Sequence, residues 1–278
     1  MSTRLSPTDM RLGLGCSRLG SINGATGREA HELLQTALDQ GVRFFDTSNI
    51  YAQGDSERYL GEVLGDRPDC VICTKGGKYV SFRNRMLIPA KGVIRWVTRR
   101  LPWARASVSK VRARPMPTCW DSDFLLRSLE ASLRRLKRSS VDIYMLHSPP
   151  AEIIRRGDAI AALESARAAG KMKQVGVSAD DAEAVAAALD DPRITVIQLP
   201  LHADDNSYDG LIAQARQQGV AVIAREILSG GPESGEDRTG FAAQRISAIT
   251  SRPDIAVTLV GTTKRPHLLS AIRAGRQH

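Results

Sequence analysis

Hydrophobic residues in this chain gather in eight short runs, and most runs are followed by a longer segment whose apolar residues recur every three or four positions. Short apolar runs are typical of buried strands, and the three-to-four spacing is typical of amphipathic helices. The pattern predicts strands at 11–15, 42–46, 70–75, 141–147, 172–178, 194–199, 220–225 and 255–260. It predicts helices near 28–40, 55–65, 121–137, 152–169, 180–190, 207–218, 239–250 and 265–274.

The alternation of strand and helix predicts a parallel sheet, because each helix returns the chain to the same end of the sheet. Eight such units in 278 residues fit a (β/α)8 TIM barrel, a fold that needs about 250 residues. We therefore expect an α/β protein with a single barrel domain over residues 1–278. Residues 79–118 are expected to be an insertion after the third strand.

No run of apolar residues is long enough to span a bilayer, and the first residues lack the apolar core of a signal peptide. We therefore expect a cytoplasmic protein without a transmembrane segment. Cys70 and Cys73 form a C-x-x-C pair on a predicted strand, where side chains three positions apart point to opposite faces. With only Cys16 and Cys119 remaining, we expect reduced, mostly buried thiols and no metal site.

The net charge of +9 comes from the predicted insertion. Residues 76–118 contain eleven Lys or Arg and no Asp or Glu, which leaves the rest of the chain close to neutral. Within this segment, residues 91–101 have one basic helical face, while the other carries Val93, Ile94, Trp96, Val97 and Leu101.

A basic amphipathic helix of this kind can form a lid over a substrate pocket, or it can dock on a membrane or a protein partner. Because the segment follows the third strand, we expect a lid at the carboxyl rim, with peripheral docking as the alternative. The positive charge suits an anionic small-molecule substrate, and no nucleic-acid partner is expected.

Four polar residues follow the carboxyl ends of the predicted strands. Asp46, Lys75 and His147 each end an apolar run, and Tyr51 lies in the loop after the first of these runs. The carboxyl ends of the strands in an α/β barrel share one rim, which is where its active sites are built. We expect these four side chains to meet there.

This ordered set resembles the catalytic tetrad of the aldo-keto reductase superfamily. Further counterparts of family motifs extend the likeness over nearly the whole chain outside 79–118, at 12–15, 44–51, 56–58, 60–61, 176–178, 198 and 261–264. The resemblance implies reduction of an aldehyde or ketone to an alcohol by hydride transfer from NAD(P)H. A nicotinamide-binding regulatory or scaffold subunit of the same fold is the alternative.

The resemblance also implies roles for the four residues. Tyr51 is expected to give its proton to the carbonyl oxygen, and His147 to hydrogen-bond that oxygen. A tyrosine normally has a pKa near 10, and the Lys75 ammonium is expected to lower it by favouring the phenolate. Asp46 is expected to keep the buried lysine charged.

Cofactor contacts are implied at three places. Ser178 and Gln198 match the family residues that hold the nicotinamide carboxamide, although Ala179 replaces an expected Asn. Arg225 stands where the family usually has an aromatic ring, and the segment after it, with Leu228 and Gly230, is expected near the pyrophosphate or as a simple surface turn.

The third place follows the last predicted strand. Gly261, Thr262, Thr263 and Lys264 precede a helix, whose N-terminus and side chains can bind a phosphate. By the resemblance this phosphate is the adenosine 2′-phosphate, so that Lys264 favours NADP(H) over NAD(H).

Overall fold

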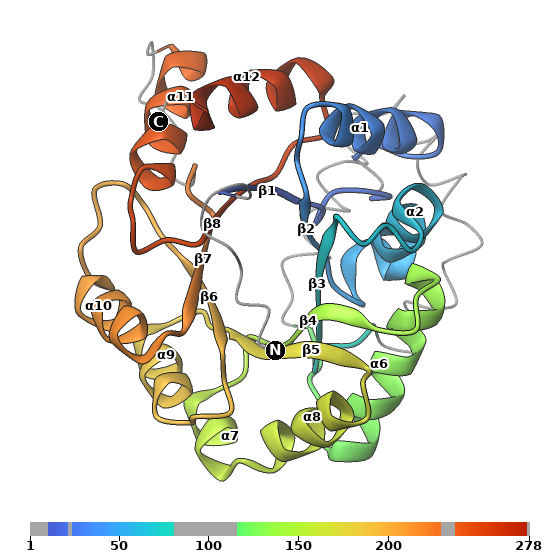
Figure 1. Cartoon of the computed structure of the whole chain (residues 1–278), viewed down its shortest axis with the longest axis vertical. Coiled ribbons are helices and arrows are strands. Elements are labelled where there is room, and N and C mark those ends of the chain that lie inside the picture. Colours follow the sequence, from blue (N-terminus) through green and yellow to red (C-terminus); the bar gives the residue numbers. More distant parts are fainter. Residues whose placement is uncertain (1–10, 22–23, 81–115, 229–236, 277–278) are drawn as a thin grey trace.

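The computed structural model describes residues 11–21, 24–80, 116–228 and 237–276, and these form a closed parallel barrel surrounded by helices (Figure 1). Each strand pairs with the next one in the sequence, and β8 pairs with β1 to close the ring. The strands are β1 Leu12–Gly15, β2 Phe44–Asp46, β3 Val71–Gly76, β4 Val141–His147, β5 Met172–Ser178, β6 Val196–Pro200, β7 Ala221–Arg225 and β8 Val257–Val260. The prediction of a (β/α)8 barrel is confirmed.

The helices lie outside this ring, as the predicted amphipathic patterns require (Figure 1). They are α1 Arg28–Asp39, the 3-10 turn η1 Tyr51–Gly54, α2 Asp55–Leu64, α6 Ser122–Leu136, α7 Ala151–Arg156, α8 Asp158–Ala168, α9 Ala182–Leu189, α10 Asp209–Gln218, α11 Arg238–Thr250 and α12 Arg265–Gly275. On α6 the leucines spaced by three and four are the buried ones, at 125, 129, 133 and 136.

The single helix predicted at 152–169 was wrong, because the chain forms two helices there. Gly157 separates α7 from α8 and has φ 78°, in the left-handed region that favours glycine and interrupts a helix. The change of direction follows from one glycine inside an otherwise continuous apolar pattern.

The inside of the barrel is filled by side chains, so it is not a channel. An inner core cluster is formed by Phe44, Cys73, Ile143, Met145, Val196, Ile223, Val257 and Leu259. Gly13 faces the same space, and a Cβ atom there would lie 2.8 Å from Leu259 Cδ2 and 2.9 Å from Phe44 Cδ1. A ligand must therefore bind at the mouth of the barrel.

The two cysteines of the C-x-x-C pair lie in different cores, as expected. Cys73 belongs to the inner cluster, whereas Cys70 packs in the larger core between strands and helices. Cys16, Cys70 and Cys73 are buried free thiols, and Cys119 is partly exposed and also free. Within the described ranges, no group of three or more His, Cys, Asp or Glu residues could hold a metal ion.

In the same ranges, no helix is both long and apolar enough to cross a bilayer. The predicted lid and docking segment falls mostly at 81–115, outside the described residues, as do residues 229–236 with Gly230. At the base of that segment, Lys78 forms an antiparallel bridge with Thr118. The extent of the single domain stays a prediction.

Candidate active site

Strand register brings the predicted site residues to one end of the barrel. Asp46 is the last residue of β2, Lys75 is the fifth residue of β3, and His147 is the last residue of β4. His147 lies opposite Ser178 at the end of β5, and Ser178 lies opposite Gln198 in β6. The parallel alignment of the strands thus places these side chains at the carboxyl rim.

Lys75 and Asp46 form a buried ion pair, with Nζ 2.6 Å from Oδ1. Lys75 Nζ also donates to the Thr47 carbonyl oxygen at 3.0 Å. Burial is the largest single effect and by itself would lower the pKa of Lys75, but Asp46, Tyr51 and Cys73 together outweigh it, so the net shift raises the pKa. The ion pair with Asp46 therefore helps to keep the lysine charged.

A hydrogen-bonded chain links this pair to the far side of the barrel. Ser178 Oγ donates to Gln198 Oε1 at 2.9 Å, and Gln198 Nε2 donates to Asp46 Oδ1 at 2.8 Å. Ser178 and Gln198 were expected to contact the cofactor, which stays a prediction. In the structure they orient the carboxylate that holds Lys75, through a link between β6 and β2 that sequence spacing does not reveal.

Tyr51 lies in η1 with its ring close to both Lys75 and His147. Lys75 Nζ is 5.4 Å from the ring centroid, and the imidazole of His147 meets the ring edge to face with centroids 5.8 Å apart. Burial raises the pKa of Tyr51, and the opposing effect of the Lys75 ammonium is smaller. Lys75 thus lowers the pKa of Tyr51 as expected, but the net shift is upward, because removal from water outweighs this one positive charge.

His147 is held by Ser48, a buried residue that the sequence analysis did not single out. Ser48 Oγ lies 2.9 Å from His147 Nδ1 and 3.1 Å from Asn49 Oδ1. Burial and the positive charges of Lys75, Lys78 and Arg225 hold the pKa of His147 well below its usual value, so the imidazole is neutral at neutral pH. A neutral imidazole oriented through Nδ1 leaves Nε2 for a ligand.

The outer side of β3 is supported by a second buried carboxylate. Glu57 on α2 accepts from Thr74 Oγ1 at 2.6 Å and from Arg135 Nε of α6 at 2.6 Å. Thr74 directly precedes Lys75, and η1 with Tyr51 directly precedes α2. This ion pair therefore fixes two helices to the strand that carries the lysine.

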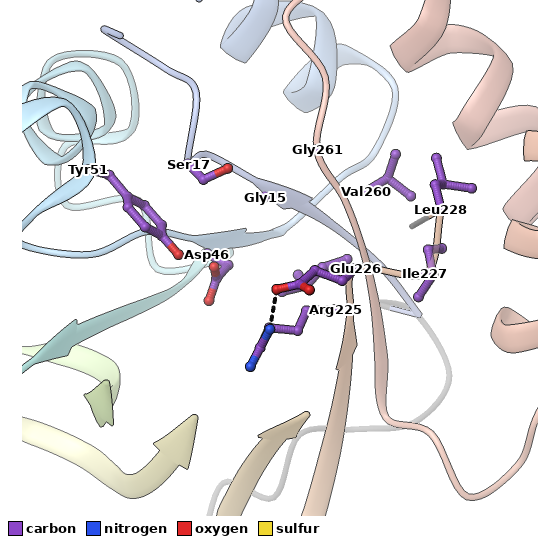
Figure 2. A pocket seen from close by; sticks show the side chains of 11 residues that line it. Gly15, Ser17, Asp46, Tyr51, Arg225, Glu226, Ile227, Leu228, Val260 and Gly261 are labelled. Atoms are coloured by element: carbon purple, nitrogen blue, oxygen red, sulfur yellow. Dashed lines mark hydrogen bonds and ion pairs between the residues drawn. The ribbon is translucent and has the colours of Figure 1, made fainter. Parts of the chain in front are cut away.

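A cavity of about 370 Å³ opens at the mouth between the tetrad and the last strands. Figure 2 shows Tyr51 and Asp46 on one side of it and Arg225 and Glu226 on the other. The remaining lining is Gly15, Ser17, Ile227, Leu228, Leu259, Val260 and Gly261. Two predicted catalytic residues, Asp46 and Tyr51, thus share one cavity with the predicted cofactor residues Arg225, Leu228 and Gly261. Its volume is typical of small-molecule sites. The other predicted site residues that the structure describes do not line it.

Arg225 projects across the carboxyl ends of β5 to β7. Its guanidinium forms ion pairs with Asp180 and Glu226 and donates from Nη2 to the carbonyl oxygen of Ala179 at 2.8 Å. Its Nε is buried and has no hydrogen-bond partner in the part of the chain that the structure describes. Glu226 has φ 58°, an uncommon conformation for a residue with a side chain.

The predicted phosphate segment lies between β8 and α12. Thr262 and Thr263 are partly exposed, and Gly261 and Lys264 are exposed. The Lys264 backbone N donates to Thr262 Oγ1 at 3.2 Å, and Pro266 stands in the first turn of α12. This geometry leaves an accessible helix N-terminus with a lysine beside it, which suits an anion.

The cavity and the segment after β8 therefore have features that suit a nucleotide. Gly15 and Gly261 line the cavity, a Cβ atom at Gly15 would lie 3.7 Å from Gly261 Cα, and the buried Arg225 Nε offers a free donor. Gly230 lies outside the described residues and remains a prediction.

Comparison with known proteins agrees with this geometry. Residues 11–273 match the sequence model of the Aldo/keto reductase family. A 6-dehydroglucose reductase of Novosphingobium aromaticivorans is 28% identical over 261 residues, which cover 85% of this chain and 72% of that protein.

Solved structures with the same fold are more distant in sequence. A holo-form aldo-keto reductase from Bacillus halodurans superposes with a TM-score of 0.73 at 19% identity, covering 96% of this chain and 87% of that one. An aldo-keto reductase from Klebsiella pneumoniae in complex with NADPH gives a TM-score of 0.68 at 20% identity, covering 95% and 85%.

Proposed function

The chain belongs to the aldo/keto reductase family, and on that premise we propose that it reduces an aldehyde or ketone to an alcohol with NADP(H). The observation that carries the proposal is the grouping of Tyr51, His147 and the buried Lys75–Asp46 ion pair at a rim whose cavity also reaches Gly261. The nicotinamide nucleotide supplies the hydride when it is bound.

Tyr51 is the proton donor in this proposal. Its raised pKa keeps the hydroxyl protonated at neutral pH, which is the form that donates to a developing alkoxide. The Lys75 ammonium, 5.4 Å from the ring, stabilises the phenolate that remains after the proton has left. Asp46 keeps that ammonium charged through both stages.

His147 positions the substrate. As a neutral imidazole it can hold the carbonyl oxygen through Nε2 without competing with Tyr51 to lose a proton. This form has its hydrogen on Nε2, so Nδ1 must accept from Ser48 Oγ at their 2.9 Å contact. The Ser48 hydroxyl would then donate to Nδ1 in place of the bond that it donates to Asn49 Oδ1 at 3.1 Å. Ser48 is thereby a positioning residue, because it selects which imidazole nitrogen carries the hydrogen.

Residues of the cofactor side complete the proposal. Ser178 and Gln198 are proposed to hold the nicotinamide carboxamide, and Arg225 and Leu228, which line the cavity, are proposed to contact the nucleotide together with Gly230 of the following segment. Gly261, Thr262, Thr263 and Lys264 are proposed to bind the 2′-phosphate, which favours NADPH over NADH. The neighbour from Klebsiella pneumoniae is described with NADPH, in agreement with this assignment.

The test is oxidation of NADPH by the purified protein in the presence of a panel of aldehydes and ketones. We expect turnover of at least one carbonyl and none with the nucleotide alone. Tight nucleotide binding without any turnover, together with a stable protein partner captured by the tagged chain, would instead support the scaffold role.

A further inference from the structure

Among the described residues, Lys75, Arg225 and Lys78 lie at the mouth of the barrel, and they differ in how many carboxylates contact them. Lys75 has Asp46 at 2.6 Å, and Arg225 has the carboxylates of Asp180 and Glu226. Lys78 has only a hydroxyl, Ser148 Oγ, at 2.8 Å, and no carboxylate of the described residues forms an ion pair with it. The sequence from 81 to 115 contains no Asp or Glu that could do so.

Lys78 is held firmly in this position. Its carbonyl oxygen accepts from Asn49 Nδ2 at 2.9 Å, and its backbone bridges to Thr118. Its partner Ser148 directly follows His147 and has φ 55°, an uncommon conformation for a serine, which presents the hydroxyl to the lysine. The ammonium is therefore fixed in the neighbourhood of His147.

This location is on the substrate side of the mouth. Lys78 and Ser148 come from the loops after β3 and β4, whereas the cavity assigned to the nucleotide is lined mostly by residues of the β7, β8 and β1 ends. Lys78 and Ser148 are absent from that lining. A ligand group at Lys78 would thus belong to the molecule that His147 and Tyr51 hold.

Electrostatics favours an anion there. The Lys78 side chain is half-buried, and burial lowers the pKa of its ammonium. The charges of Arg225 and Lys75 act in the same direction, whereas the Asp180 and Glu226 carboxylates oppose them without forming an ion pair with Lys78. A partly desolvated ammonium without a carboxylate in contact is stabilised by a negative partner. An ammonium has three donors, and among the described residues only the bond to Ser148 Oγ uses one of them, which leaves two for a ligand.

We propose that Lys78 and Ser148 form a subsite for a carboxylate that the substrate carries next to its carbonyl carbon. The preferred substrates are then 2-oxo acids, with the carbonyl oxygen at Tyr51 and His147 and the carboxylate at Lys78. This inference rests on the proposed reductase function and specifies the substrate class of the same site.

Matched substrates and variants test the subsite by kinetics. Glyoxylate is compared with methyl glyoxylate and pyruvate with methyl pyruvate, because each ester keeps the carbonyl and removes the charge. In Lys78→Met we expect kcat/KM for the acids to fall about 10- to 100-fold, the range for losing a hydrogen bond to a charged group. The esters should change less than about threefold, and Lys78→Arg should retain most of the preference for acids.

Lys171→Met is the control, since it removes a partly exposed lysine at the amino end of β5, far from the rim. In Lys171→Met, kcat/KM should be unchanged for all four substrates. Equal losses for acids and esters in Lys78→Met, or a wild-type preference for the esters, would overturn the subsite.

A binding measurement separates this inference from the proposed function. Oxalate is an unreactive analogue of glyoxylate, and its affinity for the NADP-saturated protein can be measured by calorimetry. Binding that Lys78→Met weakens about tenfold or more supports the subsite, even if no carbonyl is turned over and the reductase proposal fails. Absence of oxalate binding, or equal affinity in both proteins, overturns the subsite while leaving reduction of neutral carbonyls intact.

Discussion

The two sides of the barrel mouth are built in opposite ways. On the proposed catalytic side, which comprises Asp46, Tyr51, Lys75 and His147, the ionic groups are buried and paired by short hydrogen bonds. On the proposed nucleotide side, which comprises Arg225–Leu228 and Gly261–Lys264, most polar groups are at least partly exposed, and Arg225 Nε has no hydrogen-bond partner among the described residues. This difference is what we expect if the chemistry is organised before binding and the binding surface is completed by its ligand.

The physical reason is that an unpaired charge costs much more free energy in a buried position than in a position exposed to water. A buried ammonium without its carboxylate is strongly destabilising, so Lys75 and Asp46 must be paired in the free protein. Exposed groups such as Lys264 are solvated when the nucleotide is absent, and their side chains become ordered only when the nucleotide binds. Substitutions on the catalytic side should therefore affect rate or folding, and those on the nucleotide side should affect affinity.

The largest effect is expected for Tyr51→Phe, which removes the proposed proton donor and keeps the ring. Turnover should fall by about 10² to 10⁴, the usual contribution of a general acid, while the Kd for NADPH stays within about twofold. Steady-state kinetics and fluorescence titration measure the two quantities. Reduction at a near wild-type rate would remove Tyr51 from its assigned role.

The next largest effect is expected on stability, when the buried ion pair between Glu57 and Arg135 is broken. Glu57→Gln leaves Arg135 facing a neutral amide, and we expect the free energy of unfolding to fall by about 3 kcal/mol, as when one partner of a buried ion pair is lost. Urea denaturation measures this change. Glu62→Gln on the exposed face of the same helix should cost less than about 0.5 kcal/mol. Similar losses in both variants would show that the Glu57 pair adds nothing specific.

On the nucleotide side, Lys264→Ala should weaken NADPH binding by about 1.5 to 3 kcal/mol and leave NADH binding almost unchanged. Arg273→Ala removes the same charge from the last turn of α12 and serves as the matched control. Fluorescence titration with both nucleotides gives the answer. A loss shared equally by NADPH and NADH would mean that the 2′-phosphate binds elsewhere.

Ser48 tests the organisation of the catalytic side without removing a tetrad residue. Ser48→Ala removes the hydroxyl beside His147 Nδ1, and kcat for reduction is expected to fall about tenfold, as for one lost hydrogen bond of about 1.4 kcal/mol, with NADPH affinity retained. Ser48→Thr keeps the hydroxyl and should restore much of the rate. If the alanine and threonine variants behave alike, the hydroxyl does not position the imidazole.

The smallest effect concerns pH. Because the pKa of His147 is lowered and that of Tyr51 is raised, neither should titrate between about pH 6.5 and 10, and kcat for reduction should be flat over that range. Below about pH 6.5 the unfolded chain binds a proton at this histidine more readily than the folded protein, so stability falls as pH decreases. His147→Gln should lose that part of the decrease. A rate that titrates near neutrality would contradict both assignments.

The sequence predicted the barrel, and the meeting of Asp46, Tyr51, Lys75 and His147 at one rim, better than the hydrogen bonds that support them. Apolar runs fix where the strands lie, and Asp46, Lys75 and His147 are recognisable because each ends such a run. The link from Gln198 to Asp46 depends on side chains that cross the barrel, and no local pattern encodes it.

The pKa of Tyr51 could not be predicted for a related reason. The charge of Lys75 is visible in the sequence, but the burial that outweighs it is a property of the folded site. The break at Gly157 and the unpaired charge of Lys78 had visible signals, a glycine inside a helical pattern and a basic residue in a stretch without acids. What these two features do to the helix and to the barrel mouth could be seen only in the three-dimensional structure.

Closure of the barrel by β8 has a consequence for synthesis of the protein. Leu12 in β1 lies opposite Thr258 in β8, so β1 acquires its second neighbour only after the chain as far as β8 has left the ribosome. Until then β1 and β7 each present an unpaired edge, and such edges readily pair with strands of other chains. A nascent chain arrested before residue 257 should therefore aggregate or bind chaperones, and one released after residue 260 should do so far less.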